Sequence, residues 1–137
     1  MGIKITPADS WFSKCVRQRA NWRCEHCGTQ YDTSSTGLHC SHFHGRGNWA
    51  TRFHPENARA LCFGCHSKMG ANPFEHTEWF TEQIGEGMFQ ILLDLKRDVG
   101  LAKEYRKTKG KGEIAKFFKQ QYEQMQECET REIEAYL

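Results

Sequence analysis

Two Cys-x-x-Cys pairs constrain the fold of this chain more than any other feature of its sequence. The four cysteines are Cys24, Cys27, Cys62 and Cys65. Each pair can form a tight turn whose two thiolates hold a metal ion from one side, so two pairs together supply the tetrahedral shell of a structural zinc ion. A single pair is also typical of a redox dithiol, but two pairs at this spacing favour zinc. The sequence therefore predicts a four-cysteine zinc site, with a segment between the pairs that is long enough to fold into structure of its own.

The cysteine count and the first residues of the chain bear on the compartment. The chain has seven cysteines, and Cys15 and Cys128 lie outside the cysteine-rich segment. An odd set of this kind is more typical of metal ligands and buried thiols in a reducing compartment than of a disulfide framework. Residues 1–10 lack the apolar run of a signal peptide, and no stretch of about 18 consecutive apolar residues occurs. We therefore expect a cytoplasmic protein that does not span a membrane.

Charge is unevenly distributed along the chain. The net charge of the 137 residues is only +2, but residues 14–68 contain eight Lys and Arg against three Asp and Glu. A basic region of this kind suits a polyanion such as nucleic acid, because binding releases the counterions condensed on the phosphates. A solvated basic surface without a ligand is the alternative, and charge alone does not decide between the two.

Hydrophobic periodicity and turn residues predict the secondary structure. Asp9 or Ser10 is expected to cap a first helix that ends near Ala20, and Asn72 and Pro73 are expected to open a later one. The expected strands are 38–43 and 49–53, and the expected helices after them are 65–70, 74–84, 88–98 and 113–135, with a glycine- and lysine-rich linker at 107–112. A chain of this length is expected to form a core at 1–72 and a helical extension at 73–137 that packs on it.

Three polar residues give a more specific signal. His42, Asn57 and His66 have the order and spacing of the HNH motif, and residues 42–47 read His-Phe-His-Gly-Arg-Gly. With both cysteine pairs in register, the chain resembles zinc-ribbon HNH endonucleases of the ββα-metal (His-Me finger) superfamily. It is similar to phage NinG-like recombination nucleases over about residues 22–70. The resemblance implies an α+β fold, in which a small ββα-metal HNH core is held by the four-cysteine zinc site and carries an N-terminal helix and two to three C-terminal helices.

The resemblance also implies a role for each of the three residues. His42 matches the general base, Asn57 the residue that braces the loop between the strands, and His66 a ligand of the catalytic divalent ion. Histidine suits the role of base, since its ordinary pKa lies near neutrality. Because His66 directly follows Cys65, the structural zinc would fix the helix that carries the catalytic ligand.

One position departs from the family pattern. The residue before the general base usually helps to hold the metal, and here it is Ser41, whose uncharged hydroxyl is a weak ligand. The candidates for a second ligand are His39, Cys40 and His44. A site rich in imidazole favours Mn²⁺ or another transition metal over Mg²⁺.

The expected function is metal-dependent cleavage of DNA. A monomer with one HNH motif would nick one strand of a duplex, whereas cutting both strands would need two active sites, for example in a homodimer built through the last helix. The resemblance implies products with 5′-phosphate and 3′-hydroxyl ends. The expected DNA contacts are Arg46, Arg52, Arg59 and Lys68. The alternatives are a zinc-ribbon module that binds nucleic acid without cutting it, a protein-interaction role for the last helix, and a nuclease that resolves branched junctions.

Overall fold

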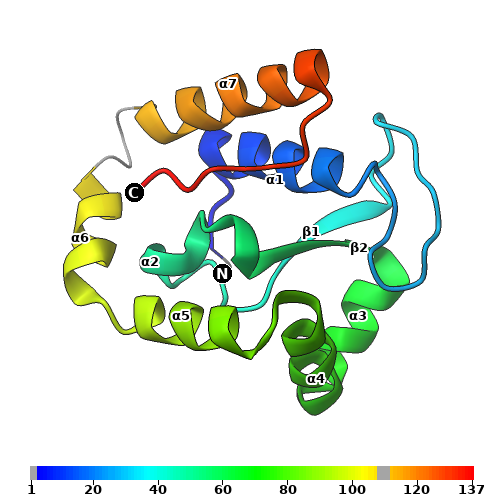
Figure 1. Ribbon diagram of the computed structural model, residues 1–137, viewed down its shortest axis with the longest axis horizontal. Helices are drawn as coiled ribbons and strands as arrows, with labels where there is room; N and C mark the ends of the chain where they lie inside the picture. The colour runs from blue at the N-terminus through cyan, green and yellow to red at the C-terminus, as the bar shows by residue number, and fades with distance from the viewer. Residues whose placement is uncertain (1–2, 108–111) are drawn as a thin grey trace.

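The computed structural model describes residues 3–107 and 112–137 and shows an α+β fold (Figure 1). Within these residues the chain forms seven α-helices, one 3₁₀-helix and one two-stranded antiparallel sheet. The elements are α1 (Pro7–Arg19), β1 (Leu38–His42), α2 (Trp49–Arg52), η1 (Pro55–Asn57), β2 (Ala58–Cys62), α3 (Phe63–Ala71), α4 (Pro73–Ile84), α5 (Glu86–Lys96), α6 (Val99–Lys107) and α7 (Glu113–Cys128). The α+β class predicted from the sequence is confirmed. None of the helices described here combines the length and the apolar character needed to cross a membrane.

The sheet is a hairpin whose register places the histidines relative to the second cysteine pair. In it, Leu38 pairs with Cys62 and His42 pairs with Ala58. The start of β1 therefore lies beside the end of β2, where α3 begins, and His42 lies at the far end of the hairpin. His39 is thus close to α3, whereas His42 is close to the loop that follows β1.

The first predicted strand is confirmed, but the predicted strand at 49–53 is wrong. Residues Trp49–Arg52 form α2, and the second strand is Ala58–Cys62, directly before α3. The aromatic residues at 49 and 53 have β propensity, whereas Ala58 and Ala60 do not. Every residue of β2 is buried, so packing on both faces overrides the weak local preference and removes the alternating pattern by which a strand is recognised.

Helix α1 begins earlier than the sequence predicted. Thr6, rather than Asp9 or Ser10, is the N-cap, and Pro7 occupies the first turn. The Thr6 hydroxyl accepts a hydrogen bond from the Asp9 N–H at 3.3 Å, and the Asp9 carboxylate accepts one from the Thr6 N–H at 2.8 Å. This reciprocal capping box satisfies two backbone donors and places the Asp9 carboxylate inside the first turn.

Helices α1 and α7 lie side by side and form the main layer of the core (Figure 1). The Phe12 ring meets Phe118 edge to face with 5.0 Å between the centroids, and Trp11 lies 6.0 Å from Tyr122. The Cys15 thiol donates a hydrogen bond to the Phe118 carbonyl at 3.3 Å. One core therefore joins residues from both sides of the predicted boundary at residue 72, and the apolar face of α7 is already covered by α1 within the same chain.

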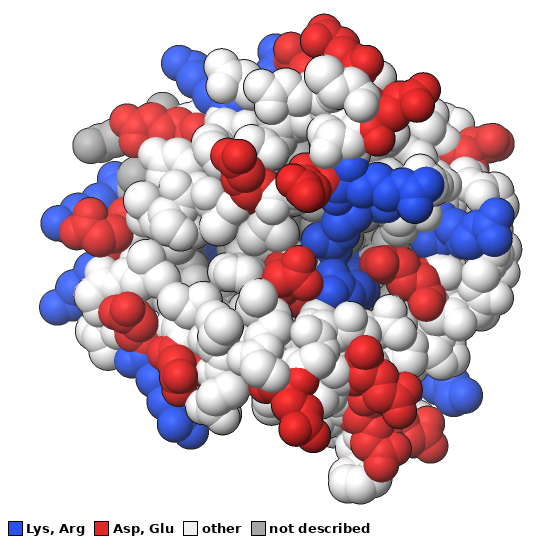
Figure 2. All heavy atoms as spheres, viewed as in Figure 1, with Lys and Arg blue, Asp and Glu red and all other residues white. Residues whose placement is uncertain are grey.

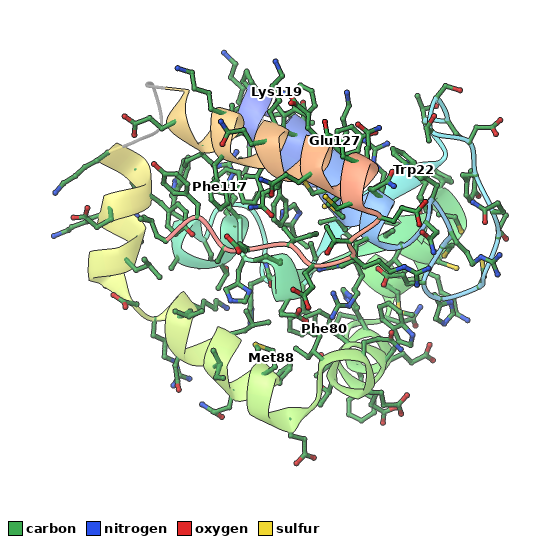
Figure 3. All side chains as sticks on the ribbon, turned by 45° about the horizontal axis from the view of Figure 1, so that its top comes forward. Trp22, Phe80, Met88, Phe117, Lys119 and Glu127 are labelled. Atoms are coloured by element: carbon green, nitrogen blue, oxygen red, sulfur yellow. The ribbon has the colours of Figure 1, made fainter. Side chains whose placement is uncertain are left out.

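A second aromatic cluster joins the helical extension to the hairpin. Phe43, next to His42, stacks on Phe80 of α4 at 4.3 Å, and Phe89 of α5 lies 5.6 Å from the Phe43 ring. Phe80 lies on the side of α4 that faces the rest of the molecule (Figure 3). Helices α4 and α5 are thus anchored beside the end of β1.

The ends of the later helices follow the predictions in part. Helix α4 stops at Gly85, whose φ of +84° favours glycine, as expected. A further helix, α6, runs through Gly100, and α7 ends at Cys128 rather than near residue 135. The last residues run back along the helices to Tyr105, whose hydroxyl accepts a hydrogen bond from the Leu137 N–H at 3.2 Å. Most of the predicted linker at 107–112 lies outside the described residues.

Candidate functional site

Four cysteines form a cluster that could hold a metal ion such as zinc. The Sγ atoms of Cys24, Cys27, Cys62 and Cys65 all lie within 4.8 Å of one another. Cys27 Sγ and Cys62 Sγ are 3.7 Å apart, close to the spacing of about 3.8 Å that two thiolates would have around a tetrahedral zinc with Zn–S bonds of about 2.3 Å. The predicted pairing of the two motifs is therefore matched by the geometry.

Backbone hydrogen bonds shape each cysteine pair. The Cys27 N–H donates to Cys24 Sγ at 3.5 Å, and the Cys65 N–H donates to Cys62 Sγ at 3.4 Å. These donors stabilise thiolate charge, and Gly28 allows the first turn with a φ of +81°. The first pair lies between α1 and β1, and the second spans the end of β2 and the start of α3. A metal ion bound here would tie that loop to the hairpin and to α3.

Asn57 braces the loop that follows β1. Its Oδ1 accepts from the His44 N–H at 2.9 Å, and its Nδ2 donates to the carbonyls of His44 and Thr51 at 3.0 and 3.1 Å. The side chain is fully buried. All of its hydrogen bonds therefore serve to hold this loop and α2 in position.

We expect Asn57→Ala to lower the free energy of unfolding by about 1–3 kcal/mol, because it leaves buried backbone groups of the loop without partners. Urea unfolding followed by circular dichroism measures this change. Asn72→Ala is the matched control, since Asn72 is exposed and its side chain donates to the Lys68 carbonyl; its effect should stay within about 0.5 kcal/mol. Equal losses in the two variants would contradict the bracing role.

His42 is held in one orientation. Its Nε2 donates a hydrogen bond to the Arg52 carbonyl at 3.0 Å, and its ring lies 5.7 Å from that of Phe12. Since a carbonyl oxygen can only accept, the hydrogen of the neutral ring is on Nε2 and the lone pair is on Nδ1. Burial, offset only in part by this hydrogen bond, lowers the pKa of His42 to about 4. The ring is therefore neutral at pH 7.

His39 and His66 meet across the gap between β1 and α3. Their Nδ1 atoms are 3.0 Å apart, and the rings are nearly perpendicular at 79°. Two nitrogen ligands at about 2.1 Å from an octahedral ion would be about 3.0 Å apart, and the same distance suits a direct hydrogen bond when one Nδ1 is protonated. Burial and the charge of His39 lower the pKa of His66, which favours the neutral, ligating form.

One pocket brings these histidines together. It lies between α1, β1 and α3 and has a volume of about 700 Å³, which is within the range of pockets that bind small ligands. Its lining includes His39, His42 and His66 together with the basic side chains Lys14, Arg17 and Arg46. The position of α1 beside β1 was not predicted from the sequence, because nothing in the local pattern shows that this helix covers this strand.

The other two candidates for a second ligand are placed less favourably. Cys40 lines the pocket, but burial raises the pKa of its thiol to about 12, which disfavours the thiolate that binds metals. His44 is buried and is not among the residues that line the pocket in the described part of the chain. Of the three candidates, His39 is the one in contact with His66.

Two of the arginines predicted to contact DNA are internal, which corrects that prediction. Arg52 is 2% exposed and binds both carboxylate oxygens of Asp9, from Nε at 3.0 Å and from Nη2 at 2.6 Å. Arg59 is 7% exposed and donates to the Ala58 carbonyl and to Glu56. Both guanidinium groups are engaged by acceptors within the chain, and little of either side chain is exposed to a phosphate. The burial of Arg52 is not recognisable from the sequence, because its partner Asp9 lies 43 residues away.

The remaining predicted contacts are accessible. Lys68 is exposed on α3, and Arg46 is half-buried in the pocket. On the face shown in Figure 2, Lys and Arg side chains gather near the centre and to its right, with Asp and Glu side chains around and below them. This face therefore carries no continuous basic surface, and the basic character of residues 14–68 is in part internal.

Neither a protein-family model, nor a curated protein, nor a solved structure matches this chain. The family expected from the HNH motif accordingly stays a prediction, and the function is inferred from the residues and their geometry.

Proposed function

We propose that the protein is a metal-dependent endonuclease of the HNH type that hydrolyses phosphodiester bonds in DNA and nicks one strand of a duplex. The observation that carries the proposal is the pocket in which a neutral, oriented His42 and the His39–His66 pair line the same space. Phosphodiester hydrolysis needs a base for the attacking water and a cation beside the phosphate. The three histidines are suited to these two tasks.

The residues on either side of the pocket support this assignment. A metal ion in the four-cysteine cluster would fix the start of α3, one residue before His66. Asn57 holds the loop and α2, and α2 supplies the Arg52 carbonyl that orients His42. In this proposal the hairpin and α3 act as the ββα-metal core that the motif implies, and each catalytic side chain is fixed by a neighbour.

In the proposed mechanism, His42 acts through Nδ1. The hydrogen bond from Nε2 to the Arg52 carbonyl leaves the Nδ1 lone pair to take a proton from the attacking water, and the same carbonyl stabilises the imidazolium that forms. His39 and His66 would hold the divalent cation, which when bound supplies positive charge to the phosphate and leaving oxygens. Their two imidazoles favour Mn²⁺ over Mg²⁺. His39 thereby takes the part that Ser41, buried in β1, does not fill.

We expect His42→Ala to lower the rate of plasmid nicking about 10²- to 10⁴-fold, the usual contribution of a general base. The measurement is conversion of supercoiled plasmid to open circle with Mn²⁺ or Mg²⁺, beside a chelator control and with zinc content confirmed for each variant. His54→Gln is the matched control. The His54 imidazole has a structural contact instead of a proposed catalytic one, since its Nδ1 caps η1 by accepting from the Glu56 N–H.

The outcomes separate the proposal from its rivals. Nicking that depends on the divalent ion and is lost in His42→Ala supports the nuclease. Binding to DNA without cutting, on linear or branched substrates, would contradict it and leave a non-catalytic zinc-ribbon module. Preferential cutting of branched DNA would identify a junction-resolving nuclease instead of a general nickase.

A further inference from the structure

One face of α1 is polar and lines the pocket. Its members recur at one-turn spacing and are Ser10, Ser13, Lys14 and Arg17. Residues three and four apart share a helix face, so these side chains form one stripe. The opposite face, with Phe12 and Val16, is in the core. Helix α1 is therefore fixed in the core on one side and presents polar groups to the histidines on the other.

The charges of the pocket favour an anion. Its described lining contains the cations Lys14, Arg17 and Arg46 and one carboxylate, that of Asp9. Asp9 is already neutralised by the buried guanidinium of Arg52, at 2.6 Å. The three cations that border the histidines thus have no competing carboxylate in this lining.

Arg17 is oriented for recognition of a phosphate. Its Nε donates to the Ser13 carbonyl at 3.2 Å, and its guanidinium carbon lies 4.8 Å from the centroid of the Trp22 ring. Among the described residues, no acceptor bonds to its two terminal nitrogens. Lys14 is placed in a similar way, with Nζ 4.5 Å from the centroid of the Trp11 ring. Aromatic contacts hold both cations while their donors stay available, and a fixed arginine fork matches two phosphate oxygens.

We infer that α1 forms the phosphate-binding wall of the pocket, where Arg17 and Lys14, with Arg46 on the loop after β1, bind backbone phosphates of the nucleic-acid strand on which the histidines act. This inference rests on the proposed function, since it takes its ligand to be nucleic acid. It assigns substrate positioning to an element outside the HNH motif. Part of the basic character of residues 14–68 thus lies in this pocket.

The test is binding of fluorescent duplex DNA by the full chain, without added Mn²⁺ or Mg²⁺, at several salt concentrations. Arg17→Gln and Lys14→Gln should each flatten the slope of log K against log salt by about 1, since each neutralised phosphate contributes about 0.9. Arg17→Gln should also weaken binding about tenfold at fixed salt. Arg17→Lys keeps the charge, so it should retain the wild-type slope. Arg97→Gln is the matched control, because Arg97 is exposed and is not among the described residues that line the pocket. Melting temperatures confirm that each variant folds.

The outcomes distinguish this inference from the proposed function. Wild-type protein that binds DNA, with unchanged slopes in Arg17→Gln and Lys14→Gln or an equal loss in Arg97→Gln, overturns the phosphate wall and leaves the nuclease proposal standing. Binding that shows the expected slopes without any metal-dependent nicking supports the wall and overturns the nuclease. Wild-type protein that binds no DNA at any salt concentration overturns both.

Discussion

Cys62→Ser is expected to abolish the cooperative folding of the protein at 25 °C. A structural zinc in such a site contributes about 10–16 kcal/mol at pH 7, whereas the total stability of a domain is about 5–15 kcal/mol. Loss of one thiolate that releases the ion therefore removes an amount comparable to the whole folding free energy. The cluster joins the loop after α1 to β2 and α3. Strand β2 pairs with β1, which contains His39, and α3 contains His66. The hairpin and the contact between His39 and His66 should therefore be lost together.

Thermal unfolding by circular dichroism and metal content by mass spectrometry test this expectation. Wild-type protein should contain one zinc ion per chain and melt in one transition, and Cys62→Ser should contain none and show no transition. Cys128→Ser is the matched control, because Cys128 is exposed and lies outside the cluster. A Cys62→Ser protein that keeps its zinc, or that melts as the wild type does, would contradict a structural role of the site.

The sequence was informative where chemistry depends on residue type and spacing. Two cysteine pairs predicted a cluster because a tetrahedral thiolate site needs those residues, and the geometry matches that prediction. Pro73 in the first turn and the positive φ of Gly85 located α4, because both are local properties. The α+β class was implied by the resemblance to HNH nucleases, and the helices and the two-stranded sheet agree with it.

The sequence was misleading where long-range packing decides. Residues 49–53 have the composition of a strand and form α2, and the buried strand β2 lacks the pattern of one. Asp9 and Arg52 resembled a helix cap and a surface cation, although they are 43 residues apart and form one buried pair. No local signal predicts such a pair, because each residue is stable in the interior only through the other.

That pair gives the second large expected effect. Asp9→Ala should lower the free energy of unfolding by about 3–5 kcal/mol, because it leaves the Arg52 guanidinium buried without its carboxylate. Asp9→Asn keeps a side chain able to accept from the Thr6 N–H, so comparing the two variants separates the capping contribution of about 1 kcal/mol from that of the ion pair. Asp32→Ala, at an exposed position, should change the stability by less than about 0.5 kcal/mol.

The pH dependence of stability should show the same pair. Burial alone would raise the pKa of Asp9, but the hydrogen bonds and charge of Arg52 and the Thr6 contacts outweigh it and lower the pKa below its ordinary value of 3.8. A carboxylate with a depressed folded-state pKa contributes stability that is fully present above the unfolded-state pKa and is lost as pH falls through the folded-state value. Urea unfolding between about pH 5 and pH 2 should therefore show a steeper loss in the wild type than in Asp9→Ala. Parallel curves would show that the pair contributes nothing.

The ion pair of Asp9 and Arg52 should also affect the proposed catalytic base, His42. Arg52 donates through its side chain to Asp9 and accepts through its carbonyl from His42, so one residue links the cap of α1 to the orientation of the imidazole. In Asp9→Ala, the Arg52 guanidinium is a buried charge without a partner, which favours its movement towards solvent. That movement would displace the Arg52 carbonyl that fixes His42. In nicking assays of Asp9→Ala, kcat should then fall by a larger factor than KM changes, under conditions where the variant is still folded.

Arg52→Met with Asp9→Leu removes both charges together and should recover stability relative to either single variant. Recovery of nicking in that double variant would assign the loss of activity in Asp9→Ala to a displaced α2. Nicking that stays low after stability returns would show that the ion pair itself helps to position His42.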